Sequence, residues 1–223
     1  MSTNIPFVLT DELSLSFSAS LKRTLGKSCI YNTSFSPEML SECPRRILYK
    51  ISGFYNVNSL ACDTRIANKN KWISIFKKTA GIRVVDTDVY ASSVDYQISG
   101  SIDVVLQVSD TIMATQIKGV NDELFAKIQD NGAFKKDVLE VMLFLWLLEL
   151  KDGLILYENV QKYDFLSFHI QLYMPMINLA KKKCEKLIGF QRAGKLIERP
   201  YKSKSDKECI SCEFLEKCWG TYE

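Results

Sequence analysis

The fold of this chain is decided by the stretch Gln97-Ile-Ser-Gly-Ser-Ile-Asp-Val-Val-Leu-Gln-Val108, followed after two residues by Thr111-Ile-Met-Ala-Thr-Gln-Ile-Lys-Gly-Val120. After Gly81 the apolar pattern changes from a helical period to a period of two or to short apolar runs, which is typical of strands. A third strand is predicted just before these two, over residues 82–89. Three strands in succession indicate an antiparallel meander.

Helices are predicted around these strands. Upstream, Ser36-Pro37-Glu38 is typical of a helix start, and apolar residues recur at helical spacing until Gly53. This places Cys43 on a helix face. The further elements that the pattern predicts are helices over 59–79, 121–129, 133–150 and 175–190, and strands over 154–157 and 165–170.

The long apolar helix over 133–150 is expected to be buried against the sheet, because it is apolar nearly all round from Val141 to Leu148. The order of helices and strands predicts an α/β fold with a mixed central sheet flanked by helices.

Composition favours an ordinary globular protein. The 223 residues are 47% hydrophobic and 25% charged, enough for one core with a small appended subdomain. No secretory signal is visible in residues 1–10, and the longest apolar run is too short to span a bilayer. We therefore expect a cytoplasmic protein with no membrane partner and with reduced cysteines. A net charge of +3 is too small to indicate nucleic-acid binding by itself.

Three cysteines are crowded near the C-terminus, and a fourth lies far upstream in Ser-Glu-Cys-Pro-Arg-Arg. A Cys-x-x-Cys turn lets two thiolates reach one metal, and a third thiolate six residues on occupies another corner of a tetrahedral shell. The spacing therefore predicts one metal site formed by Cys43, Cys209, Cys212 and Cys218. Zinc and a four-iron four-sulfur (4Fe-4S) cluster both accept four thiolates. The other cysteines, Cys29, Cys62 and Cys184, are expected to be buried thiols.

A second candidate site lies on the two central strands. Alternation places Gln116 and Lys118 on one face and Ile117 on the other, and Asp103 on the neighbouring strand is expected at the same end of the sheet. An acid and an amide oxygen can hold a divalent metal such as Mg²⁺ or Mn²⁺, and a lysine can stabilise developing phosphate charge. Taken alone, the pattern also fits an ordinary surface strand.

In combination, these motifs resemble the RecB-like branch of the PD-(D/E)XK nucleases, and within it the CRISPR-associated and bacteriophage iron-sulfur exonucleases. The resemblance covers roughly residues 36–220. It depends on the order and spacing of Cys43-Pro-Arg-Arg, Gly100-Ser-Ile-Asp103, Gln116-Ile-Lys118, the helix from Glu140 to Leu148, the segment 153–159, and the three C-terminal cysteines.

The resemblance implies a restriction-endonuclease-like core with a C-terminal iron-sulfur subdomain, and it favours the 4Fe-4S cluster over zinc. The corresponding parts of the chain are an N-terminal arm at 1–35, an N-terminal helical region carrying Cys43 at 36–80, a nuclease-like core at 81–190 and a C-terminal cysteine cluster subdomain at 191–223.

The sequence departs from the family pattern at three points. Gln116 stands where the family usually has Glu. No histidine occurs in the stretch 65–72, where Asn70 is the nearest equivalent, and the family's Gln-x-x-x-Tyr appears here as Glu140 to Phe144. One hypothesis is that Glu140 supplies the missing acid; otherwise it pairs with Lys136 or caps a buried helix. Asp88 is a weaker second candidate, and the single histidine, His169, is interpreted as structural.

The first functional interpretation is a metal-dependent DNA nuclease, an exonuclease acting on ends or single strands. Asp103 and Gln116 would hold the metal, and Lys118 would stabilise charge near the scissile phosphate. Arg45 and Arg46 would contact the DNA backbone. Stacking on unpaired bases is expected of aromatic residues such as Tyr49, Trp72 or Tyr157.

Two other interpretations remain open. The three departures fit a catalytically degenerate nuclease-fold subunit that serves DNA binding or assembly, with partners in a replication, recombination or phage machine. A zinc-ribbon adaptor would explain the cysteines but not the pattern from Gly100 to Lys118.

Overall fold

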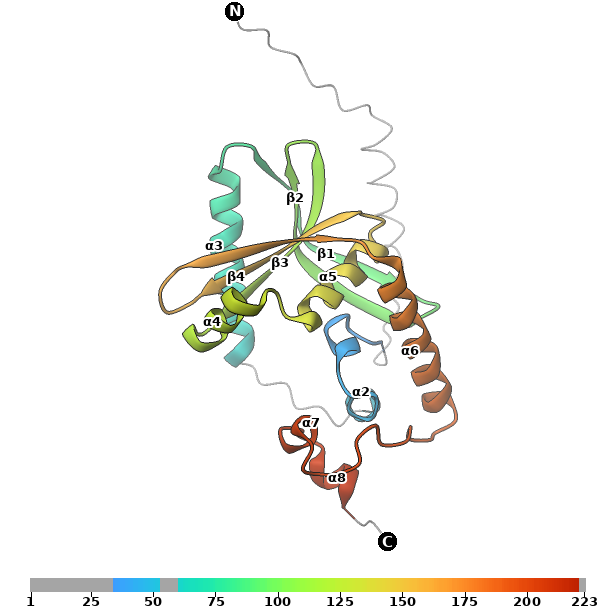
Figure 1. The fold of residues 1–223 in the computed structure, drawn as a ribbon. Helices are drawn as coiled ribbons and strands as arrows, with labels where there is room; N and C mark the ends of the chain where they lie inside the picture. The colour runs from blue at the N-terminus through green and yellow to red at the C-terminus, as the bar shows by residue number, and fades with distance from the viewer. Residues whose placement is uncertain (1–33, 53–59, 221–223) are drawn as a thin grey trace, which may run out of the picture.

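A single five-stranded mixed sheet organises the protein (Figure 1). The computed structural model describes residues 34–52 and 60–220. In these residues the strands follow one another across the sheet in chain order: β1 (Ile82–Ser93), β2 (Ile98–Val108), β3 (Thr111–Val120), β4 (Asp152–Asn159) and β5 (Phe165–Gln171). β1 to β3 form the predicted antiparallel meander, β3 and β4 pair in parallel, and β4 and β5 form a hairpin. The predicted α/β fold with a mixed sheet is confirmed.

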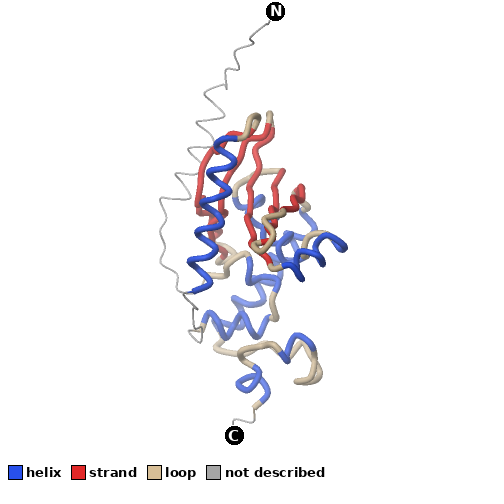
Figure 2. The backbone as a smooth tube through the Cα atoms, turned by 90° about the vertical axis from the view of Figure 1, so that its left-hand side faces the viewer, coloured by secondary structure: helices blue, strands red, loops and turns tan. Residues whose placement is uncertain are grey.

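Helices cover both faces of this sheet. Those of the described residues are η1 (Glu38–Ser41, a 3₁₀ turn), α2 (Pro44–Ile51), α3 (Leu60–Lys78), α4 (Asp122–Asn131), α5 (Lys135–Leu147), α6 (Met174–Arg192), α7 (Lys207–Ile210) and α8 (Leu215–Trp219). Figure 2 shows α3 running along one face of the sheet. On that face Trp72, Ile73 and Phe76 of α3 pack against Val104, Leu106, Ile117 and Leu156. No described helix is long and apolar enough to cross a membrane.

The opposite face is covered by α5, which is buried as its apolar sequence predicts. Val141, Leu143, Phe144 and Leu145 belong to the main core together with strand residues of this face. The approach is closest at Gly153 of β4, where an added Cβ atom would lie 2.7 Å from Cγ1 of Val141 and 3.0 Å from the backbone oxygen of Ala114. A glycine is therefore required at this position for α5 to reach the sheet.

Substituting Gly153→Ala should lower the free energy of unfolding by about 1–3 kcal/mol, because neither a β-branched valine nor a backbone carbonyl can yield without strain. Urea denaturation measures the effect. Gly189→Ala is the matched control, since Gly189 lies inside α6 with nothing within 4 Å of the added Cβ. That change should stabilise the protein by about 0.5–1 kcal/mol. Equal effects of the two changes would contradict the close approach.

The predicted first helix is wrong in one respect: Cys43 does not lie on a helix face. Proline disfavours the helical region for the residue before it. Cys43 is accordingly extended, with φ −55° and ψ 130°, and it precedes the first residue of α2, Pro44. The backbone N–H of Met39 donates to Oγ of Ser36 (3.3 Å), but only the short turn η1 follows.

Further sequence predictions differ at their boundaries or lie outside the described residues. β1 continues four residues beyond the predicted end at residue 89, to Ser93. Phe35 forms an isolated parallel bridge with Ile98. Most of the predicted N-terminal arm, Cys29 and the helix end at Gly53 lie outside the described residues, as does the side chain of Cys62.

Candidate functional site

β2 and β3 bring Asp103 beside the run Gln116-Ile117-Lys118. Val104 pairs with Thr115 in the antiparallel ladder, so Asp103 and Gln116 are the next residues along the two strands. Oδ2 of Asp103 accepts a hydrogen bond from the backbone N–H of Ile117 (2.8 Å). Ile117 packs toward α3, whereas Lys118 faces α5, where its ammonium meets two carboxylates. The residues predicted to form the site therefore lie together in the middle of the sheet, just beyond the last paired residues of β2 and β3.

Glu140 of α5 belongs to the same site. Its Oε2 lies 2.5 Å from Nζ of Lys118, and Oδ1 of Asp137, one helical turn earlier, lies 3.3 Å from the same nitrogen. Tyr157 of β4 donates its hydroxyl hydrogen to Oδ2 of Asp137 (2.5 Å). Glu140 thus pairs with Lys118 rather than with Lys136. Asp137 was missed by the sequence analysis, because only the packing of α5 on the sheet brings it near Lys118.

Burial sets the electrostatics of this cluster. Asp137 and Glu140 are 3% and 4% exposed. Burial raises the pKa of Glu140, and the Lys118 ammonium opposes that rise. For Lys118, burial favours the neutral amine, but the carboxylates of Glu140 and Asp137 together outweigh it and raise the pKa. Burial also raises the pKa of Tyr157, with its hydrogen bond to Asp137 as a further cause. Lys118 is therefore a charged ammonium between two buried acids.

The side chain of Gln116 is fully buried. Neither Oε1 nor Nε2 meets a donor or acceptor among the described residues. A buried amide without partners costs free energy, so such groups are rare in folded proteins. Gln116 lies on β3 beside Asp103 of β2. Nearby, the two buried acids Asp137 and Glu140 share the single ammonium of Lys118. This donor set, a carboxylate and a neutral oxygen, is what a hard divalent cation takes.

The remaining candidates do not join this cluster. Asp88 is exposed and pairs with Lys69 of α3. His169 is exposed, and its Nε2 lies 2.7 Å from Oδ1 of Asp152 in the same hairpin. Asn70 is also exposed, whereas Asn68, also on α3, lies beside Gly119 of β3, directly after Lys118.

All four predicted cluster cysteines line one cavity. Cys43 contributes from the start of α2, and Cys209, Cys212 and Cys218 contribute from the segment of α7 and α8. Arg45, Arg199 and Trp219 are among the other residues of its wall. Lys183 of α6 fixes the segment before Cys43, because its ammonium donates to the carbonyls of Leu40 (2.8 Å) and Glu42 (2.6 Å).

Among the described residues, neither site has acids, histidines or thiols that are already arranged to bind a single metal ion by themselves. Within residues 34–52 and 60–220, no three His, Cys, Asp or Glu side chains are arranged to bind one ion. At the strands, a cation would therefore depend on Gln116 and water besides Asp103. At the cysteines, the four thiols surround a shared cavity without converging on one point.

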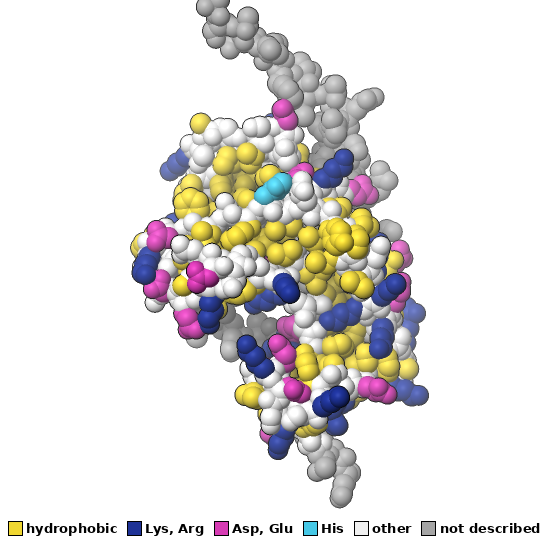
Figure 3. Space-filling model, viewed as in Figure 1, with side chains coloured by type: hydrophobic (Ala, Val, Ile, Leu, Met, Phe, Trp, Pro, Cys, Tyr) yellow, Lys and Arg dark blue, Asp and Glu magenta, His cyan; other side chains and the backbone are white. Residues whose placement is uncertain are grey.

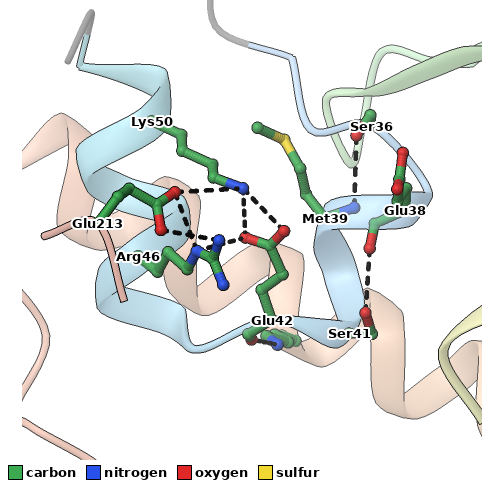
Figure 4. A network of polar contacts seen from close by, with 9 residues as sticks. Ser36, Glu38, Met39, Ser41, Glu42, Arg46, Lys50 and Glu213 are labelled. Atoms are coloured by element: carbon green, nitrogen blue, oxygen red, sulfur yellow. Dashed lines mark hydrogen bonds and ion pairs between the residues drawn. The ribbon is translucent and has the colours of Figure 1, made fainter. Parts of the chain in front are cut away.

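Arg46 and Tyr49 fasten the cysteine-bearing segment to α2. Figure 4 shows Arg46 and Lys50 of α2 around the carboxylate of Glu213, with Glu42 on the other side. Arg46 contacts Glu213 with two nitrogens, at 3.1 and 2.7 Å. Burial favours a neutral guanidinium, but Glu42 and Glu213 outweigh it and raise the pKa of Arg46. The Tyr49 ring packs on Phe214, with centroids 5.3 Å apart.

The nucleic-acid contacts predicted for Arg45, Arg46 and Tyr49 stay predictions, and the structure gives each side chain a contact inside the protein. Nη2 of Arg45 donates to the hydroxyl of Tyr49 (3.3 Å), and Tyr49 is 4% exposed. Around α7 and α8, positive and negative side chains are interspersed on the face shown in Figure 3. That face therefore carries no patch of one sign over these helices.

The aromatic residues that the sequence singled out for base stacking are buried. Trp72 is 7% exposed and Tyr157 is not exposed at all, so both rings pack inside the protein. Strongly exposed aromatics are found instead in the turn after β4 and at the start of β5, where Tyr163 and Phe165 are 73% and 57% exposed. The sequence analysis missed them, because nothing in their spacing separates an exposed ring from a buried one.

Comparison with known proteins finds similarity in fold but not in sequence. The sequence matches no protein-family model, and a search of curated proteins finds no match either. Among solved structures, the alkaline exonuclease LHK-Exo from Laribacter hongkongensis in complex with dAMP superposes with a TM-score of 0.60 at 11% identity, covering 80% of this chain and 92% of that one. The chain shares its fold with this exonuclease.

Two further structures share this fold. A phage-related exonuclease from Haemophilus somnus 129PT matches with a TM-score of 0.51 at 11% identity, over 72% of this chain and 94% of that chain. The protein SSO0001 matches with a TM-score of 0.55 at 16% identity, over 97% of this chain and 98% of that chain. The match to SSO0001 therefore covers a larger share of this chain than either exonuclease match does.

Proposed function

We propose that this protein is a metal-dependent DNA nuclease of the PD-(D/E)XK type, acting as an exonuclease on DNA ends or single strands. The observation that carries the proposal is the juxtaposition of Asp103, Gln116 and Lys118 just beyond the last paired residues of β2 and β3. The Gln116 amide is buried there and meets no partner among the described residues. The likeness to exonucleases, one of them in complex with dAMP, supports the same activity.

The donors present fit Mg²⁺ or Mn²⁺. Asp103 and the amide oxygen of Gln116 would hold the ion, which keeps several water molecules when few protein ligands are available. When bound, the ion supplies a Lewis acid and lowers the pKa of a bound water. Lys118 carries a positive charge beside the scissile phosphate, and Glu140 and Asp137 hold that charge in place.

A cleavage assay on end-labelled single- and double-stranded DNA, with Mn²⁺ or Mg²⁺ and with a chelator, tests the proposal. Progressive shortening from an end that requires the metal is the expected result. Cleavage that is equally fast in the chelator, or no cleavage of any DNA with either metal, would overturn it.

A second candidate is a catalytically degenerate subunit that uses the same fold for DNA binding or assembly in a larger machine. Two observations favour it. Gln116 offers a neutral oxygen where a carboxylate binds a dication more strongly. Lys118 already lies between two carboxylates, which compensate its charge in the absence of DNA.

Substituting Gln116→Glu separates the two candidates. The added carboxylate increases the negative charge of the donor set, so a degenerate protein should gain metal-dependent cleavage that the natural sequence lacks. An active enzyme should change its rate by less than about tenfold, since it already binds its metal through Gln116. The measurement is the cleavage rate over a titration of Mn²⁺. Loss of existing activity would show that the neutral amide itself is required.

We further propose that Cys43, Cys209, Cys212 and Cys218 hold a 4Fe-4S cluster. A cluster takes one thiolate for each iron, so its four ligands surround it without meeting at one point. The four cysteines line one cavity, which supports such a group, whereas the described residues offer no convergent set for a single zinc ion. When bound, the cluster supplies a covalent connection between α2 and the C-terminal segment.

Iron and acid-labile sulfide analysis after anaerobic purification tests the cluster, with about four irons expected per chain. Cys212→Ser should lose the iron. Cys184→Ser is the matched control: Cys184 is buried in the core, where burial raises its pKa to about 12, and its substitution should leave the iron unchanged. Zinc in place of iron, or iron retained in Cys212→Ser, would contradict the proposal.

A further inference from the structure

An open groove lies outside the ends of β3 and β4. These strands run in parallel, so their carboxyl ends meet at the same edge of the sheet, and ligands of open α/β sheets commonly bind outside such ends. α4 follows β3 there, and the turn 160–164 follows β4. Between them, the groove of about 360 Å³ is lined by Phe125, Gln129, Tyr163, Asp164, Phe165 and Leu166.

The turn presents Tyr163 in a fixed position. Tyr163 has φ 61°, in the left-handed region that an aromatic residue rarely adopts. Its backbone N–H donates to the carbonyl of Asn159 (2.8 Å), and Oδ1 of Asn159 accepts from the N–H groups of Gln161 (3.0 Å) and Lys162 (3.2 Å). Asn159 itself is buried, at 1% exposed. The exposed ring therefore extends from an ordered support.

A lysine and a second ring accompany Tyr163. Nζ of Lys71 lies 4.8 Å from the centroid of the Tyr163 ring, and it also pairs with Glu158. Glu158 accepts from Nε1 of Trp72 (2.6 Å), and Trp72 supports the exposed ring of Phe165 at 5.2 Å between centroids. Two exposed rings, an ammonium group beside them and the amide of Gln129 in the groove thus form one surface.

We propose that this groove binds unpaired nucleobases of the DNA strand on which the proposed nuclease acts, with Tyr163 and Phe165 as stacking residues. This inference builds on the proposed function and names the substrate class: a strand with unpaired bases. Exposed aromatic rings next to a positive charge are the chemistry that binds single strands without regard to sequence, because every base has a flat face. The amide of Gln129 can bond to the polar edge of a base.

The surrounding charges are compatible with this occupant. Asp122 and Glu123 at the start of α4 would repel phosphates, but Lys162 pairs with Asp122 (2.8 Å) and Lys127 pairs with Glu123 (2.6 Å). Lys71 of α3, whose side chain is 40% exposed, lies beside the Tyr163 ring. In the proposed complex the strand's phosphates lie near Lys71, and its bases face the groove.

Fluorescence anisotropy with end-labelled single-stranded oligothymidylate, in a chelator so that no cleavage occurs, tests the inference. Tyr163→Ala should weaken binding by about tenfold, Tyr163→Phe should bind like the natural protein, and Phe165→Ala should also weaken binding. Because stacking is less sensitive to salt than phosphate contacts are, the ratio between Tyr163→Ala and the natural protein should persist as salt is raised. Tyr173→Ala is the matched control. Tyr173 is 57% exposed but lies beyond the opposite end of β5.

Unchanged binding by Tyr163→Ala, or an equal loss in Tyr173→Ala, would overturn the inference and leave the exposed rings as a surface for a protein partner. No binding of the single strand by the natural protein would overturn it as well. Cleavage of duplex ends in that case would leave the proposed nuclease function intact. Conversely, the natural protein could bind the single strand through Tyr163 but cleave no DNA. That result would support the groove and contradict only the proposed catalytic activity.

Discussion

Substituting Lys118→Met should lower the free energy of unfolding by about 3–5 kcal/mol, because it leaves two buried carboxylates without their shared cation. The side chains of Asp137 and Glu140 are each 5% exposed, and Lys118 is 17% exposed, so water cannot replace the lost partner. Methionine keeps most of the volume of the lysine stem. Urea denaturation followed by circular dichroism measures the change, and DNA cleavage should be lost in the same variant.

The loss should depend on pH. Burial already raises the pKa of Glu140, and without the ammonium that opposes it the pKa should rise further. A carboxyl group whose pKa is higher in the folded state binds more protons there, so stability falls as pH rises through its range. The deficit of Lys118→Met should therefore be smaller at about pH 5 than at about pH 8. A second substitution, Glu140→Gln, should recover part of the stability by removing one buried charge.

The matched control is Lys127→Met, which breaks the pair with Glu123 on the surface of α4. Both side chains of that pair are more than half exposed, so the change should stay within about 0.5 kcal/mol. If Lys118→Met were equally mild at both pH values, the three charges would not form the buried cluster described here.

Substituting Asp103→Asn should reduce metal-dependent cleavage by at least about a hundredfold while leaving the fold intact. Losing a charged ligand removes several kcal/mol of stabilisation of the reacting charge, and each 1.36 kcal/mol corresponds to about tenfold in rate. The amide oxygen of Asn still accepts from the N–H of Ile117, as Oδ2 of Asp103 does at 2.8 Å. The cleavage rate at saturating Mn²⁺ and the unfolding midpoint are measured together.

Asp88→Asn is the control for this experiment. Asp88 lies on the neighbouring strand β1 and is exposed, with its carboxylate paired to Lys69 away from the cluster. Its φ of 53° suits asparagine, so the fold should tolerate the change. Cleavage should be unchanged. Full activity in Asp103→Asn, or a loss of activity in Asp88→Asn, would place the chemistry elsewhere.

The sheet and the residues it carries could be predicted from local pattern. Period two specifies which side chains share a face, so Gln116 and Lys118 were separated from Ile117 before any contact was known. The extended conformation of Cys43 was equally local, since the proline after it restricts its backbone, but helical spacing was given more weight than that restriction. Local rules therefore compete, and a proline outweighs apolar periodicity at the residue before it.

The partners of Lys118 could not be predicted in the same way. In the sequence, all of α4 lies between Lys118 and the two acids Asp137 and Glu140. Only the packing of α5 on the sheet, which Gly153 allows, brings these acids within reach of Lys118. Lys136 was an equally reasonable partner for Glu140 on helical spacing alone. The exposure of Tyr163 likewise depends on the hydrogen bonds of Asn159 in the turn. Long-range packing, which sequence spacing does not encode, decides the partners of Lys118, whereas local hydrogen bonds in the turn place Tyr163.

The parallel pairing of β3 with β4 has a consequence for how the protein folds. Short turns join β1 to β3 and join β4 to β5, so each of these two units closes locally. The parallel seam between the units, where β3 pairs with β4, requires a crossover through α4 and α5. Contacts of long sequence separation form late, because the chain entropy of closing the loop is lost before they are gained. Lys118 and Tyr157 are neighbours across that seam. Asp103 and Gln116 therefore come together early, within the locally closing meander, whereas Asp137 and Glu140 are expected to reach Lys118 late in folding. The ion pairs around Lys118 should accordingly be lost first when β3 and β4 separate.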